Sequence, residues 1–111
     1  QDIVNQVDIW GQEIQSKNIQ TLDSATKALQ ISIRIGSPAT LKASFIDPKM
    51  IEIMDALDYS IGQKQEIPPS IQKNTAGDSL YYFYPSDAGK ITVLGFAKNI
   101  VIQNMDRPLI K

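Results

Sequence analysis

The sequence predicts an α+β fold: a two-layer sandwich with a long N-terminal helix followed by an αββαββ-like, ferredoxin-like antiparallel sheet. Two observations indicate this. Apolar residues repeat with a helical period over the first thirty positions, and the period then changes to two, with a second helical segment between two pairs of strand-like segments. A chain of 111 residues holds one hydrophobic core. We expect an α+β domain over residues 21–111 and a projecting or coiled-coil helix over residues 1–20.

The predicted first helix covers residues 2–30, which contain one glycine and no proline. Its apolar stripe consists of Ile3, Val7, Trp10, Ile14, Leu22, Ala25 and Leu29. The polar Asn18 marks either a break between two nearly collinear helices or a position that fixes register. An unbroken helix would span about 40 Å, whereas a domain of this size has a radius of gyration of about 13 Å. Either the first half projects towards a partner, or the chain folds back at Lys17–Asn18.

The next segment predicts a β-hairpin. Isoleucines alternate with polar residues over 31–35, and Leu41, Ala43 and Phe45 alternate with polar residues over 41–45. Turn residues separate the two predicted strands at 36–39.

A second helix is predicted from Asp47–Pro48 to Gly62. Asp is a favoured N-cap and Pro is tolerated at the first helical position, while Gly is a common helix end. Its apolar residues, at helical spacing, are Met50, Ile53, Met54, Leu57 and Ile61.

Residues 63–78 follow neither period and predict a long loop, held to the body at Ile67 and Ile71. Two strands, 80–84 and 91–96, then form a hairpin in which Gly95 is a possible bulge. Residues 100–102 form an optional last strand, and Pro108 ends regular structure. We expect both helices to pack on one face of the sheet.

The composition excludes many chemistries. The chain contains no His and no Cys, which removes His-based and Cys-based catalysis and nearly all zinc sites. The six glycines are too dispersed to form a phosphate loop. The net charge is −1, and the eleven Lys and Arg residues are scattered, so nucleic acid is not an expected partner. We predict no catalytic, cofactor-binding or metal site, and not an enzyme.

Six of the twelve acidic residues fall into two sets. One set repeats every three residues along the second helix and indicates a solvated face, with a hard-cation site as the minor alternative: Glu52, Asp55 and Asp58. The other set lies at predicted turns, where Asp forms local hydrogen bonds: Asp78, Asp87 and Asp106. Their spacing does not require the pair of carboxylates that a hydrolase would use.

Aromatic and apolar residues supply the candidate binding positions. In a strand over 80–84, Tyr81 and Phe83 face one way and Tyr82 and Tyr84 the other, so one pair enters the core and the other covers an outer face or lines a pocket. The predicted protein-interaction residues are Val7, Trp10, Ile14, Ile67 and Ile71.

The order of elements, a helix with heptad-like spacing and then two αββ units, resembles the periplasmic part of inner-membrane assembly-platform proteins of type IV pilus and type II secretion systems, the PilO and GspM type. The resemblance transfers no individual residue. It implies a non-enzymatic interaction domain, a homodimer or bound to an envelope-assembly protein, and periplasmic. Because the chain begins at Gln1 and has no stretch of about 20 apolar residues, we expect a mature protein or fragment, anchored to the inner membrane by a segment absent from it.

Two fainter resemblances give alternative functions. Pilin-like subunits also set a long N-terminal helix against an antiparallel sheet. Extracytoplasmic sensor domains are similar in leading a long helix into a sheet lined with aromatics, and here a ligand pocket would be bordered by Tyr82, Tyr84 and the 63–78 loop.

Overall fold

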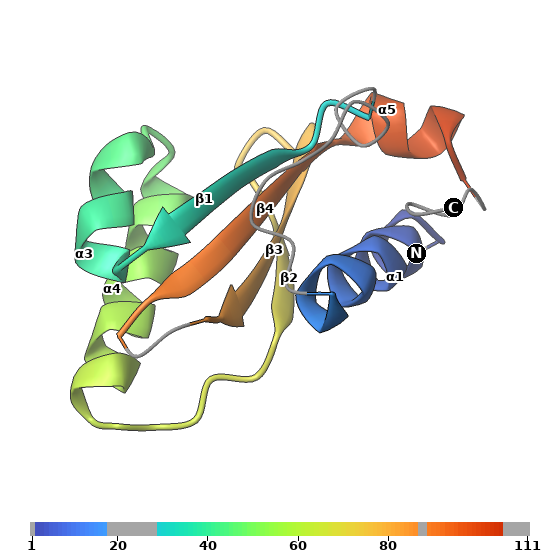
Figure 1. The fold of residues 1–111 in the computed structure, drawn as a ribbon. Helices are drawn as coiled ribbons and strands as arrows, with labels where there is room; N and C mark the ends of the chain where they lie inside the picture. The colour runs from blue at the N-terminus through green and yellow to red at the C-terminus, as the bar shows by residue number, and fades with distance from the viewer. Residues whose placement is uncertain (1, 18–28, 87–88, 106–111) are drawn as a thin grey trace.

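The computed structural model describes residues 2–17, 29–86 and 89–105. The elements in chain order are α1 (Asp2–Ser16), β1 (Ser32–Gly36), α3 (Pro38–Leu41), the 3-10 helix η1 (Lys42–Ser44), α4 (Pro48–Gly62), β2 (Ser70–Lys73), β3 (Ser79–Pro85), β4 (Ile91–Ala97) and α5 (Lys98–Gln103). Helices packed on an antiparallel sheet confirm the α+β class. The sheet stands between α1 on one side and α3 and α4 on the other (Figure 1).

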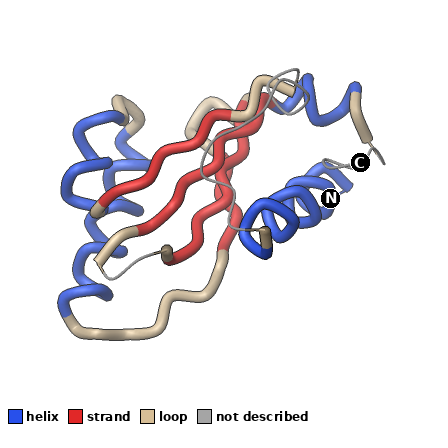
Figure 2. The backbone as a smooth tube through the Cα atoms, viewed as in Figure 1, coloured by secondary structure: helices blue, strands red, loops and turns tan. Residues whose placement is uncertain are grey.

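The sheet has four strands in the order β1-β4-β3-β2, and every neighbouring pair is antiparallel. Strands β2, β3 and β4 form a meander, and β1 joins it beside β4 from a distant part of the chain. Across the sheet, Ile71, Tyr82, Leu94 and Ile33 lie opposite one another in neighbouring strands. Figure 2 shows the strands as one layer with helices on both sides.

Each face of the sheet carries its own buried cluster. On one face, Leu80, Tyr82, Tyr84, Leu94 and Phe96 pack with the apolar stripe of α1. On the other face, the alternate residues Phe83, Ile91 and Val93 pack with Met50 and Met54 of α4 and with Leu41 and Phe45. The prediction that both helices share one face is therefore wrong. Because β3 and β4 carry large apolar side chains on both faces, both faces need a cover.

The predicted strand over 41–45 is also wrong, because these residues belong to α3, η1 and the residue that follows. Ser37 begins the helical segment: its Oγ accepts a hydrogen bond from Thr40 N at 3.3 Å, and Pro38 occupies the first turn. Leu41 and Phe45 are four residues apart, one helical turn, and both are buried. The residues expected to form a hairpin turn are instead a helix start.

Three further differences lie in the C-terminal half. The predicted loop over 63–78 contains β2, so the αββαββ order does not hold. Residues 100–102 are helical, within α5. Gly95 is not a bulge, because the register of β3 with β4 is continuous; a Cβ there would overlap Ser32 Oγ.

The predictions for α4, β1, β3 and β4 are confirmed. The N-terminal helix ends at Ser16 and lies on the sheet, so it does not project. The expectations for Asn18, Leu22, Ala25, Asp87, Asp106 and Pro108 lie outside the described residues.

Candidate interaction surface

Three of the predicted interaction residues are core residues. Val7, Trp10 and Ile14 are 0% exposed, and the Trp10 ring stacks on Phe96 with the ring centroids 6.0 Å apart. The prediction that they form an interface is corrected for a physical reason. It followed from the alternative in which the first half of the helix projects, but α1 has 15 residues, is about 22 Å long and packs these three side chains into the cluster on the sheet.

The contact between α1 and the sheet is close at Gly11. A Cβ at this position would lie 2.6 Å from ring carbons of Tyr82, so only glycine lets the ring lie against the helix. The Tyr82 hydroxyl donates a hydrogen bond to Gln15 Oε1 at 3.3 Å. Burial raises the pKa of Tyr82 and of Tyr84. These two rings, which would border the ligand pocket of the alternative sensor function, fill the core under α1.

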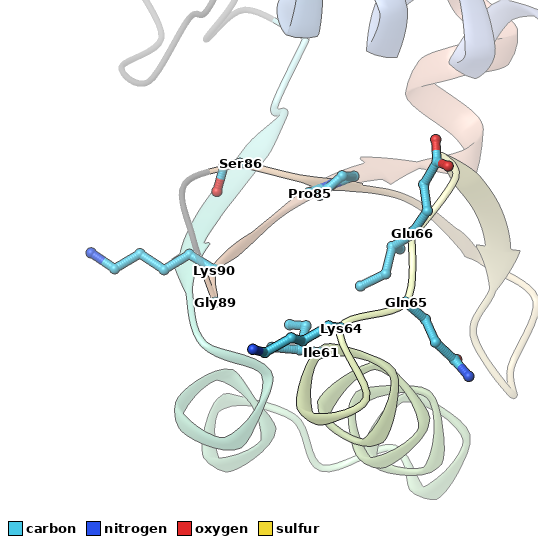
Figure 3. Close-up of a pocket in the computed structure, with 9 residues that line it drawn as sticks. Ile61, Lys64, Gln65, Glu66, Pro85, Ser86, Gly89 and Lys90 are labelled. Carbon is cyan, nitrogen blue, oxygen red and sulfur yellow. The ribbon is translucent and has the colours of Figure 1, made fainter.

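The remaining predicted interaction residues, Ile67 and Ile71, are half-buried. Ile71 lies opposite Tyr82 and packs against the cluster on the α1 side. Ile67 lines an open hollow of about 340 Å³, between the end of α4 and the β3–β4 hairpin (Figure 3). Its other lining residues are Ile61, Lys64, Gln65, Glu66, Pro85, Ser86, Gly89 and Lys90. The amino group of Lys90, at the left of the view, and the carboxylate of Glu66, at the upper right, both point away from the centre of the hollow (Figure 3).

Asp47 does more than the predicted capping. Its carboxylate accepts a hydrogen bond from Lys49 N at 3.0 Å, which caps α4, and bonds from the backbone N–H and the hydroxyl of Thr75, 28 residues away. The Thr75 hydroxyl, then its N–H, lowers the pKa of Asp47 below its ordinary value. The carboxylate therefore ties α4 to the turn between β2 and β3. Sequence reasoning missed this long-range tie, for which a lone Thr gives no signal.

Two of the other predicted acids, Asp55 and Asp78, have side-chain partners. Glu52, Asp55 and Asp58 are exposed on α4, as predicted for a solvated face, and Asp55 pairs with Lys42 at 2.8 Å. Asp78 accepts a hydrogen bond from the Asn74 side chain at 2.7 Å within its turn. The described part of the chain contains no group of three or more potential metal ligands.

The two edges of the sheet differ. Strand β2 has four residues, follows Pro68–Pro69 and ends at the exposed Lys73. Short length, Pro and Lys are features that prevent an edge strand from pairing with another chain. Strand β1 has five residues, without Pro or Lys, and Ile35 is 40% exposed. No strand of the described residues pairs with its outer edge.

Arg34, the one charged residue of β1, packs its side chain against Phe45. The guanidinium carbon of Arg34 is 4.6 Å from the centre of the Phe45 ring, a cation–π geometry. Its Nη1 atom is buried and has no hydrogen-bond partner among the described residues. The outer edge of β1, with Ile35 and Arg34, is the candidate interaction surface.

Comparison of the chain with protein-family models, curated protein sequences and solved structures finds no match. Within the described ranges, no helix is long and apolar enough to cross a membrane.

Proposed function

We propose that the protein is a non-enzymatic protein–protein interaction domain of a bacterial envelope assembly, in a pilus or secretion machinery. The observation that supports it is the outer edge of β1, which no described strand covers. The unpaired N–H and C=O groups of an edge strand bind an extended segment of another chain. The interaction residues are thus those of β1, in place of Val7, Trp10 and Ile14.

The envelope setting rests on the resemblance in element order. The structure shares fewer elements with that order than the sequence predicted. The helix before an antiparallel sheet remains, but the first αββ unit has α3 and η1 in place of its second strand, and β2 adds a strand to the second unit. A periplasmic location and an anchor outside this chain belong to the same proposal.

A ligand-binding sensor domain is the second candidate, and the hollow in Figure 3 favours it. Its site would be formed by Ile61, Ile67 and Pro85, since the buried Tyr82 and Tyr84 do not border it. The two candidates therefore place the functional surface in different parts of the molecule, at the outer edge of β1 or at the hollow beside the connector after α4.

The experiment compares three substitutions in cells that make the full-length protein. Ile35→Lys changes the β1 edge, Ile67→Asp changes the hollow, and Ile46→Lys is the matched control because Ile46 is 94% exposed and lies outside the sheet. Assembly of the envelope complex is measured by photo-crosslinking from position 32, an exposed residue of the same strand, with protein level as the folding control.

We expect Ile35→Lys to abolish assembly and Ile46→Lys to leave it unchanged. If Ile35→Lys assembles normally while Ile67→Asp loses activity, the interaction proposal is wrong and the sensor function replaces it. If the protein is found in the cytoplasm, the envelope setting is wrong.

A further inference from the structure

We infer that the partner of the β1 edge is a second copy of this chain, paired antiparallel about a two-fold axis at Ile33. The inference rests on the proposed interaction function and names its partner. Three features carry it: the symmetry of the strand sequence, the unpaired Arg34 and the protected edge at β2.

The sequence around β1 matches itself in antiparallel orientation. Residues 31–35 read Ile-Ser-Ile-Arg-Ile, so two copies centred on Ile33 set apolar positions against apolar positions. Ile33 then faces the partner's Ile33, and Ile31 faces the partner's Ile35. Directly opposed side chains are the main stabilising pairs of a sheet, and Ile35, now 40% exposed, would gain a neighbour.

Arg34 selects this register over its neighbours. A register centred on Arg34 would oppose two guanidinium groups, which is unfavourable, and one centred on Ile35 would oppose Arg34 to the partner's Gly36. A register centred on Ser32 would oppose Arg34 to the partner's Gln30, which precedes β1 and has a φ of 55°. Of the registers that keep the residue opposite Arg34 within β1, only the one centred on Ile33 sets Arg34 against a side-chain acceptor, the hydroxyl of the partner's Ser32. Ser32 is exposed, and its Oγ lies beside Gly95 on the face of the sheet that carries Arg34.

An inward-facing charge on an edge strand usually prevents pairing, because pairing would bury it. Here the guanidinium already lies over Phe45 with Nη1 buried and unpaired, so this cost exists in the single chain. Because one nitrogen of the group is already buried in the single chain, pairing adds little to this cost.

The β2 edge explains why association would stop at two copies. Joining two β1 strands gives one sheet of eight strands, twice the four of one chain, with a β2 strand at each outer edge. Those edges are short, follow Pro68–Pro69 and end at Lys73. Because a two-fold interface uses the same surface on both copies, the dimer is closed.

The chain contains no Cys, so single introduced thiols test the register. In the inferred dimer, Ile33→Cys places two Cα atoms about 4.5 to 5.5 Å apart, within the range of a disulfide. Ile35→Cys is the matched control: its Cα and that of the partner's residue 35 would be about 13 Å apart at 3.3 Å per residue. Each full-length variant is oxidised mildly and analysed on non-reducing gels, with sedimentation of the unmodified protein.

We expect disulfide-linked dimers from Ile33→Cys and almost none from Ile35→Cys. Preferential cross-linking at position 35, or a protein that remains monomeric in sedimentation and cross-links at neither position, overturns the inference.

A charge pair at Ser32 tests the same register without relying on a disulfide. Ser32→Glu sets a carboxylate against the partner's Arg34 and should lower the dimer Kd about two- to fivefold, whereas Ser32→Lys should raise it by a similar factor. The gain from Ser32→Glu should shrink at high salt. Circular dichroism checks that both variants fold, and an equal effect of the two substitutions overturns the register.

These results separate the inference from the proposed function. A protein that is monomeric in solution but loses its envelope complex through Ile35→Lys keeps the proposed function and overturns the second copy as partner. If Ile33→Cys gives the expected cross-link but Ile35→Lys leaves assembly in cells unchanged, the dimer is supported and the assembly function is overturned.

Discussion

Gly11 sets the distance between α1 and the sheet. Alanine is the better helix former by about 1 kcal/mol, so Gly11→Ala would stabilise a free helix. Here its Cβ would lie 2.6 Å from the Tyr82 ring, and overpacking of this kind costs about 1 to 3 kcal/mol. We expect a net loss of stability, measured by urea unfolding.

The control for Gly11 is Gly62 at the end of α4, where an added Cβ meets nothing within 4 Å. Gly62→Ala should not destabilise the protein. Equal effects at the two glycines would mean that α1 does not pack as closely on Tyr82 as the structure indicates.

The tie between Asp47 and Thr75 predicts a pH dependence. The folded-state pKa of Asp47 is lowered from its ordinary 3.8, chiefly by the Thr75 hydroxyl, so the carboxylate stabilises the fold above that pH. This contribution is lost as the pH falls through the lower folded-state pKa. Thr75→Val removes the hydroxyl. We expect the stability of this variant to fall less than that of the native protein between neutral pH and pH 3.

Urea unfolding over that pH range measures the difference. Thr75→Ser keeps the hydroxyl and should retain the native profile. Parallel profiles for Thr75→Val and the native protein would show that the bond between the two side chains does not persist in solution.

Among the elements, α4 gives the clearest energetic prediction. Met54 is 0% exposed and contacts the cluster on its face of the sheet, while Leu57 is only half-buried. Met54→Ala should therefore cost about 2 to 5 kcal/mol and Leu57→Ala should cost less. Denaturant melts that rank the two substitutions in the opposite order would place a different face of α4 on the sheet.

The elements that the sequence predicted correctly have a sustained period or a distinct end. Helix α4 has both, with Asp47 and Pro48 at its start, whereas β3 and β4 are seven-residue runs rich in aromatic or β-branched residues, with turn residues between them. The predictions failed where the pattern was short. Leu41, Ala43 and Phe45 alternate as in a strand, but Leu41 and Phe45 also fit one helical turn, and β2 has four residues whose pairing depends on β3, outside its own sequence.

The sequence predicted part of the candidate site. The alternation over 31–35 was recognised as a strand, but no local pattern says which strand lies at an edge, because strand order depends on distant pairing. Likewise, the sequence identified the apolar stripe of α1. The pattern alone does not say whether a partner protein or the chain's own sheet buries that stripe.

At the scale of the whole molecule, the two clusters meet at β3 and β4, which contribute side chains to both faces. The N-terminal stripe and these strands are separated by about 70 residues along the chain, taking Trp10 and Leu80 as examples. We therefore expect α1 to dock only after β3 and β4 have paired.

Trp10 is the only tryptophan, so its fluorescence reports this docking. In a chain that ends after β3, at residue 86, Trp10 should have the red-shifted emission of an exposed indole, because Leu94 and Phe96 are missing from its cluster. A buried, blue-shifted Trp10 in that chain would show that α1 docks without β4.

Because β4 is synthesised late, the apolar side of α1 has a different environment during synthesis than in the folded protein. The ribosome releases α1 well before the strands that cover it, so Val7, Trp10 and Ile14 are exposed on the nascent chain until β3 and β4 have been made. Exposed apolar segments of this kind are the ones that aggregate or recruit chaperones. Three side chains that are fully buried in the native fold are thus, for a time, an exposed apolar surface of the growing polypeptide.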